Sequence, residues 1–195
     1  IRIPAALQGL VGFKNTQRLT PLDGCIPLSS TLDTSCIITR SVRDAVRLHE
    51  VLAARAVALQ ARVVRLLRLA VPKTLMLDDL EPPVAQAFDD ALRRLRDAGA
   101  RIDEVELPVL QRLATLNAQG GFAAAESWAW HRARLATRAD RYDPRVAMRI
   151  RRGQAIGAAD YIDLLQARRA WIAEVETALA PYDAMLSPTV PMVAP

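Results

Sequence analysis

Cysteine is scarce in this sequence of 195 residues, with Cys25 and Cys36 as the only two. Two isolated cysteines exclude a disulfide scaffold and a structural zinc site, and they are typical of a protein of the reducing cytoplasm. No apolar run approaches the roughly 20 residues that a membrane-spanning helix needs, so we expect no membrane partner. Aromatic residues contribute only 5%, and a core must therefore consist mainly of Ala, Leu, Val and Ile.

Lysine is also rare, because Lys14 and Lys73 are the only two, and arginine supplies nearly all of the net charge of +5. The arginines are spread along helical stretches and are interleaved with Asp and Glu, without interleaved aromatic residues. This distribution indicates a solvated, arginine-rich surface, and a nucleic-acid interface is the less favoured alternative.

The sequence lacks the usual catalytic and cofactor motifs. It contains no HExxH motif, no G-x-S-x-G elbow and no glycine-rich loop that leads into a helix, so we predict neither a metal nor a cofactor. His49 and His131 each lie within a helical pattern and are interpreted as surface or hydrogen-bonded helix histidines. Ser29 and Ser30 lie in a loop without a base nearby in sequence, which favours capping or turn roles.

The texture of the sequence changes near residue 41. The first 40 residues are rich in Gly, Pro, Ser and Thr, which is typical of tight loops around a site. Ser41 is a predicted helix N-cap, because Asp44 lies three residues on and apolar residues recur at helical spacing as far as Leu52. The segment 53–66 is predicted to be a flexible connector, with a continuation of the helix as the alternative.

A strand, a helix and a second strand are predicted next, over 67–71, from Pro82 to Gly99, and over 102–107. This order predicts a right-handed crossover in an α/β sheet. Helices are then predicted at 109–117, 119–136, 144–153 and 158–180, with a short buried strand at 183–186. Trp128 and Trp130 are predicted to be packing residues at the edge of a pocket.

The first 14 residues, IRIPAALQGLVGFK, resemble the end of the motif of the amidase signature family, G-G-S-I-R-x-P-A followed by G-x-x-G-x-K-P-T. Further matches follow in the order of the family: Pro21–Gly24, Pro27–Ser29, Leu32–Thr34, Arg40–Asp44, Tyr142–Val146, Arg149–Gly153, Tyr161, Tyr182–Asp183 and Ser187–Pro191. The resemblance covers essentially the whole chain, and the opening motif is its specific part.

The resemblance implies amide hydrolysis through a serine acyl-enzyme. In the family, a neutral lysine acts through a bridging cis-serine on a nucleophilic serine, and backbone N–H groups stabilise the oxyanion. The nucleophile would stand immediately before Ile1, with the other two residues further upstream, so the 195 residues are expected to be an inactive fragment without catalytic residues. Arg149 falls where the A subunits of related tRNA amidotransferases carry an arginine associated with substrate recognition, and an ordinary surface arginine is the alternative.

The resemblance also implies a partial amidase signature fold, with a mixed β-sheet core covered by helices and truncated at both ends. The chain would be the central part of a single amidase domain. Its expected segments are a post-nucleophile loop and strand segment (1–40), a helix and crossover (41–107), a helical pocket region (108–180), and a strand with a Pro-rich loop (181–195). The expected partner is a small-molecule amide, and the full-length enzyme is a candidate homodimer.

The sequence departs from the family pattern at four places. Where the family has Pro, Gly, Arg and Gly-Pro, this sequence has Asn15, Arg18, Leu19 and Cys36–Ile37, respectively. A left-handed backbone at Arg18 would cost about 1 kcal/mol or more. Such departures favour a decayed gene, and two alternatives to a hydrolytic amidase stay open. One is a fragment of the A subunit of a glutamine-dependent tRNA amidotransferase, which would meet nucleic acid only indirectly, and the other is a non-catalytic remnant or pseudoenzyme.

Overall fold

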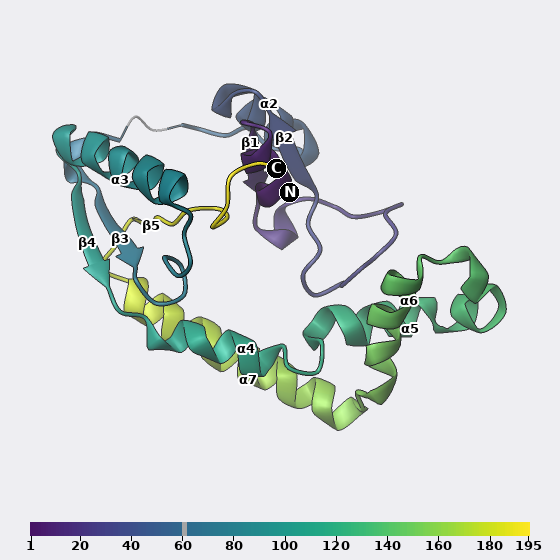
Figure 1. Cartoon of the computed structure of the whole chain (residues 1–195). Helices are drawn as coiled ribbons and strands as arrows, with labels where there is room; N and C mark the ends of the chain where they lie inside the picture. Colours follow the sequence, from purple (N-terminus) through teal and green to yellow (C-terminus); the bar gives the residue numbers. More distant parts are fainter. Residues whose placement is uncertain (60–61) are drawn as a thin grey trace. The chain divides into compact units, whose positions relative to one another are not determined.

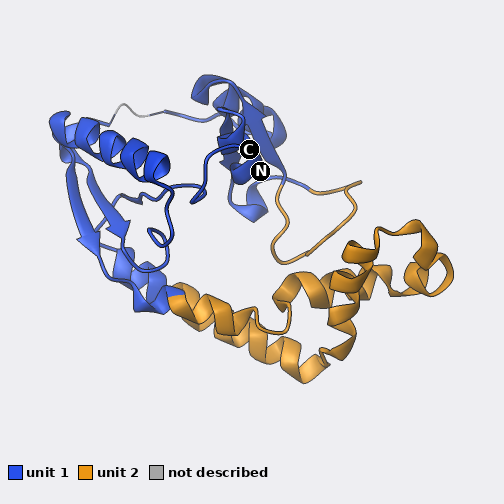
Figure 2. Ribbon diagram, in the orientation of Figure 1, with its two compact units in different colours: residues 1–21, 35–110, 174–195 blue, residues 22–34, 111–173 orange. Residues whose placement is uncertain are grey.

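The computed structural model describes residues 1–59 and 62–195 of the chain. These residues form two compact units (Figure 2), of which unit 1 comprises 1–21, 35–110 and 174–195 and unit 2 comprises 22–34 and 111–173. Within the described ranges, no helix is long and apolar enough to cross a membrane. The expectation of a single amidase domain stays a prediction.

Unit 1 begins with a short helix that packs on a two-stranded antiparallel sheet (Figure 1). Helix α1 (Arg2–Leu7) precedes strand β1 (Val11–Lys14), which pairs with β2 (Cys36–Thr39). A Cβ atom built on Gly12 would lie 2.8 Å from the Cβ of Ala5, so the glycine permits this close approach of helix and strand. The predicted loop and strand segment 1–40 therefore also contains a helix, too short to produce a periodic pattern.

Helix α2 (Val42–Leu52) begins as predicted. The Ser41 hydroxyl accepts a hydrogen bond from the backbone N–H of Asp44 at 3.1 Å and donates one to the Asp44 carboxylate at 2.7 Å, which is a capping arrangement. The helix ends at Leu52, and the alternative that it continues through 53–59 is wrong. A short 3-10 helix, η2 (Val64–Leu66), follows, and residues 60–61 of the predicted connector lie outside the described residues.

A parallel three-stranded sheet forms the other part of unit 1. Its strands β3 (Arg68–Pro72), β4 (Arg101–Val105) and β5 (Ala184–Met185) are arranged in the order β4-β3-β5. Helix α3 (Pro82–Asp97) connects β3 to β4, which confirms the predicted strand, helix and strand. Strand β4 ends two residues earlier than predicted, because the N–H of Leu107 donates to the Thr74 hydroxyl at 3.0 Å instead of continuing the ladder.

Unit 2 is helical, as the spacing of apolar residues predicts. It contains helices α4 (Arg112–Leu116), α5 (Gly121–Arg138) and α6 (Pro144–Arg151) and most of α7 (Ala158–Leu179). The buried side chains of Leu135, Ala147 and Ile150 form its core, and Trp128 and Tyr142 pack against them. The packing role predicted for Trp128 is confirmed.

Gly153 brings the segment after α6 into direct contact with α5. It lies in the 3-10 helix η5 (Arg152–Ala155), and a Cβ atom at this position would be 2.0 Å from the backbone oxygen of Ala124. Since no side chain fits in that space, a glycine is required for η5 to pack on α5.

The departures from the family pattern fit the backbone without strain. Arg18 lies in the 3-10 helix η1 (Gln17–Leu19) and is not among the residues with a positive φ, so the left-handed conformation considered for it is not adopted. Asn15 is buried, and its Nδ2 donates to the Thr20 hydroxyl at 2.9 Å. Ile37 is buried within β2. These substitutions therefore introduce no left-handed backbone, although the buried Oδ1 of Asn15 has no hydrogen-bond partner among the described residues.

Candidate substrate pocket

Unit 2 contains a pocket of about 630 Å³ between the loop 26–28 and the helices α5, α6 and η5. Its walls are mainly apolar, with a small number of polar side chains, as is usual for a small-molecule site. The pocket is lined by Ile26, Pro27, Leu28, Gly120, Ala123, Ala124, Ser127, His131, Tyr142, Val146, Arg149, Ile150 and Arg152.

A histidine and a tyrosine form a polar pair in the pocket wall. His131 Nδ1 and the Tyr142 hydroxyl are 2.8 Å apart and share a hydrogen bond, and their rings meet edge to face. Burial lowers the pKa of His131, and the positive charge of Arg134 lowers it further. The lowered pKa favours the neutral imidazole, which can both donate and accept a hydrogen bond. The prediction that His131 is a hydrogen-bonded helix histidine is confirmed.

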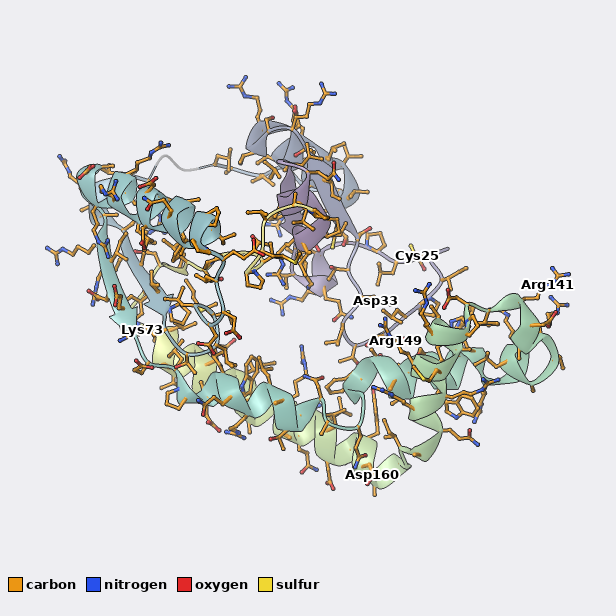
Figure 3. All side chains as sticks on the ribbon, in the orientation of Figure 1. Cys25, Asp33, Lys73, Arg141, Arg149 and Asp160 are labelled. Atoms are coloured by element: carbon orange, nitrogen blue, oxygen red, sulfur yellow. The ribbon has the colours of Figure 1, made fainter. Side chains whose placement is uncertain are left out.

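Arg149 lies in the last turn of α6 and lines the same pocket (Figure 3). Asp143 begins this helix by accepting hydrogen bonds from the backbone N–H groups of Arg145 and Val146, which fixes the start of α6. Arg152 also lines the pocket, so two arginine residues border a largely apolar cavity. The role of Arg149 in substrate recognition stays a prediction, and the structure gives it a suitable position.

Sequence reasoning missed Glu126, a carboxylate of α5 that accepts four hydrogen bonds from three residues of other segments. Its Oε2 accepts hydrogen bonds from the Ser29 hydroxyl at 2.7 Å and from the backbone N–H of Thr31 at 2.9 Å. Its Oε1 accepts from the Tyr161 hydroxyl at 2.6 Å and from the Thr31 hydroxyl. Burial alone would raise the pKa of Glu126, but the donors at Thr31, Tyr161 and Ser29 outweigh burial and lower it. The signal available in the sequence was that Glu126 is a single charged residue within an apolar stretch of α5.

Ser29 has a larger role than the predicted turn or cap. Its backbone oxygen accepts hydrogen bonds from the N–H groups of Leu32 and Asp33, which confirms the turn. Its side chain, however, donates to Glu126 in α5, 97 residues away. The predicted turn role of Ser29 is therefore confirmed, and its hydroxyl has an additional long-range contact that the sequence did not predict.

His49 differs from its prediction as a surface or hydrogen-bonded histidine. It is buried within α2 and contacts the ring of Phe13 edge to face, and its Nδ1 has no hydrogen-bond partner among residues 1–59 and 62–195. In the same described ranges, no group of three His, Cys, Asp or Glu side chains could hold a metal ion.

The similarity to known proteins covers the whole chain. The model of the protein family described as Amidase matches residues 1–195. The chain belongs to the amidase family. This amidase chain is 32% identical, over 198 residues, to 2-amino-5-chloromuconic acid deaminase of Comamonas testosteroni, and the match covers 100% of the chain and 43% of that relative. It is also 28% identical, over 228 residues, to the glutamyl-tRNA(Gln) amidotransferase A subunit of Thermotoga maritima, with 100% of the chain and 48% of that relative covered.

A solved structure described as an amidase superposes on the chain with a TM-score of 0.90 at 32% identity. The superposition covers 100% of this amidase chain and 44% of the solved one. The predicted fold class, a mixed α/β arrangement that resembles the amidase signature fold, is thereby confirmed. The chain spans 43% and 48% of the length of the two curated relatives.

Proposed function

We propose that this chain supplies the substrate pocket of an amide hydrolase that acts through a serine acyl-enzyme. The observation that carries the proposal is the pocket of about 630 Å³ in unit 2, within a chain that matches its family over residues 1–195. The lysine, bridging serine and nucleophilic serine of the family pattern would precede Ile1. The 195 residues by themselves are accordingly expected to release no ammonia from amides.

The pocket favours a small amide with an apolar acyl part and an acidic group. Apolar residues of α5, α6 and the loop 26–28 would surround the acyl part, and Arg149 would pair with a carboxylate. The name of the deaminase relative specifies a carboxylic acid as its substrate, which supports this class. The neutral His131 and Tyr142 would bind a polar group of the substrate by hydrogen bonds.

Ammonia release tests the proposal. The product of the open reading frame that encodes this sequence would be assayed with matched amides that do and do not carry a carboxylate. We expect hydrolysis, with the acidic amides preferred, and no activity from the 195 residues alone. A reading-frame product that hydrolyses no amide would contradict the proposal and favour a non-catalytic remnant.

A second candidate is the A subunit of a tRNA amidotransferase, supported by the similarity to the Thermotoga maritima protein. This function would require partner subunits that receive the released ammonia. Glutaminase activity that appears only after the addition of such subunits would favour it, whereas hydrolysis by the isolated protein would favour the hydrolase. We further propose that the enzyme is homodimeric and cytoplasmic. Cys25 and Cys36 form no disulfide in the described residues, which supports the cytoplasmic location.

A further inference from the structure

The carboxylate of Glu126 joins three segments of unit 2. Glu126 belongs to α5, Ser29 and Thr31 to the loop 22–34, and Tyr161 to the first turn of α7. Each carboxylate oxygen accepts two hydrogen bonds, so four O–H and N–H donors converge on one side chain. An ionised carboxylate only accepts hydrogen bonds, and it therefore satisfies all four donors at once.

The loop that Glu126 contacts also has hydrogen bonds of its own. The Asp33 carboxylate accepts hydrogen bonds from the backbone N–H groups of Leu28 and Ser29, at 2.8 and 2.9 Å. The N–H groups of Leu32 and Asp33 in turn donate to the backbone oxygen of Ser29. Because the turn 28–33 is closed by these bonds, fixing Ser29 and Thr31 also fixes Leu28.

This turn begins at Leu28, and Ile26 and Pro27 directly precede it. All three residues line the pocket. The side chains of Ile26 and Leu28 are 75% and 59% exposed, so little apolar burial holds this wall in position. The hydrogen bonds of Ser29 and Thr31 to Glu126 tie this loop to α5.

We propose that Glu126 is a positioning residue that holds the wall formed by residues 26–28 and thereby decides which acyl groups the pocket accepts. The part of this inference that concerns acyl groups rests on the proposed amidase function. The part that concerns the position of the loop does not, since it can be measured without substrate. Glu126 touches no reacting atom in this scheme and acts through Ser29 and Thr31.

The first experiment measures amide hydrogen exchange in the whole chain, for Glu126→Ala and for Glu176→Ala as the matched control. Alanine preserves helix α5 but removes all four acceptor positions. Glu176 is an exposed residue of α7. We expect exchange in 22–34 to rise at least about tenfold in Glu126→Ala, because hydrogen bonds to charged groups are worth at least that factor. Exchange in α6 should change little, and the control should match the wild type.

Two further variants keep the experiment decisive. Glu126→Gln retains one carbonyl oxygen and should restore part of the protection, which a general loss of packing would not predict. If Glu126→Ala does not fold, Thr31→Val removes one hydroxyl donor alone and should raise exchange in 22–34 by a smaller factor. Unchanged exchange of this loop in the folded variants overturns the inference.

The second experiment uses the amidase that contains this chain and compares amides with small and bulky acyl groups. Glu126→Ala should raise KM about tenfold for bulky acyl groups and change kcat and the KM of the smallest amides less than about twofold. An equal loss for all amides overturns the role in specificity. Faster loop exchange in a protein that hydrolyses no amide, even as wild type, overturns the proposed function and supports the anchoring role of Glu126.

Discussion

The Tyr142 hydroxyl lies 2.8 Å from Nδ1 of His131, and both side chains line the pocket of unit 2. Tyr142→Phe removes this hydrogen bond and keeps the ring against the core of unit 2. We expect the free energy of unfolding of unit 2 to fall by about 1 kcal/mol, the usual net value of one such bond. Urea unfolding of the wild type, Tyr142→Phe and Tyr182→Phe measures the difference, and Tyr182→Phe, whose ring packs under Arg68, should be neutral.

Gly153 is the position of unit 2 that we expect to be most sensitive to a small side chain. In Gly153→Ala, the new methyl group would meet the backbone oxygen of Ala124 at 2.0 Å, and a backbone atom cannot rotate away. We expect a loss of about 1–3 kcal/mol of unfolding free energy. Gly157→Ala is the control, because its methyl group would be 3.2 Å from a carboxylate oxygen of Asp160, which can move. Equal stability of the two variants would contradict the packing of η5 on α5.

Arg149 should discriminate between acidic and neutral amides. In the amidase that contains this chain, Arg149→Gln removes the guanidinium group from the pocket wall. We expect KM for carboxylate-bearing amides to rise roughly tenfold to hundredfold, as for the loss of a charge-assisted hydrogen bond, while neutral amides are unaffected. Arg151→Gln changes an exposed arginine of the same helix that does not line the pocket, and it should have little effect. A uniform effect on both substrate classes would count against carboxylate binding.

Glu126 should make the stability of unit 2 dependent on pH in the acid range. Its pKa in the folded protein is lowered from the ordinary value of 4.5, against burial, by the donors at Thr31, Tyr161 and Ser29. A lowered folded pKa means that the stabilisation is complete above pH 4.5 and is lost as the pH falls below 4.5 through the folded pKa. The difference in unfolding free energy between wild type and Glu126→Gln should therefore be constant above pH 4.5 and shrink below it. A difference that grows on acidification would refute this assignment.

Thermal unfolding of the 195-residue chain should depart from a two-state transition. The chain forms two compact units, and large apolar side chains such as Val51 and Leu66 are 75% and 73% exposed. We expect a broad or multiple transition in calorimetry and poor solubility on heating. A single sharp transition with equal calorimetric and van't Hoff enthalpies would contradict this prediction.

The local signals in the sequence predict the helices well. Ser41 with Asp44 predicts the start of α2, and Pro82 with Gly99 predicts the limits of α3, because caps and fixed backbone angles act within a few residues. The end of β4 was not predictable in the same way. It depends on the hydroxyl of Thr74, which lies 33 residues before Leu107 in sequence.

Contacts between residues far apart in the sequence were also not predictable in unit 2. Arg149 could be selected through its place in a family pattern, and Trp128 through its helical context. Glu126 could not, because its hydrogen bonds join it to Ser29 and Tyr161, which are 97 and 35 residues away. Only the tertiary structure brings these polar groups together, and no spacing rule of helices or strands contains that information.

The separation in sequence between the loop 22–34 and the helices 111–173 has a consequence for the order of folding. Local contacts within the helices can form first, whereas the bond between Ser29 and Glu126 must close a segment of 97 residues. Loop closure over such a distance is entropically costly, so this contact forms late and slowly. During synthesis, the segment 22–34 leaves the ribosome long before its partners exist. The pocket is therefore completed only after α5 and α6 have been made.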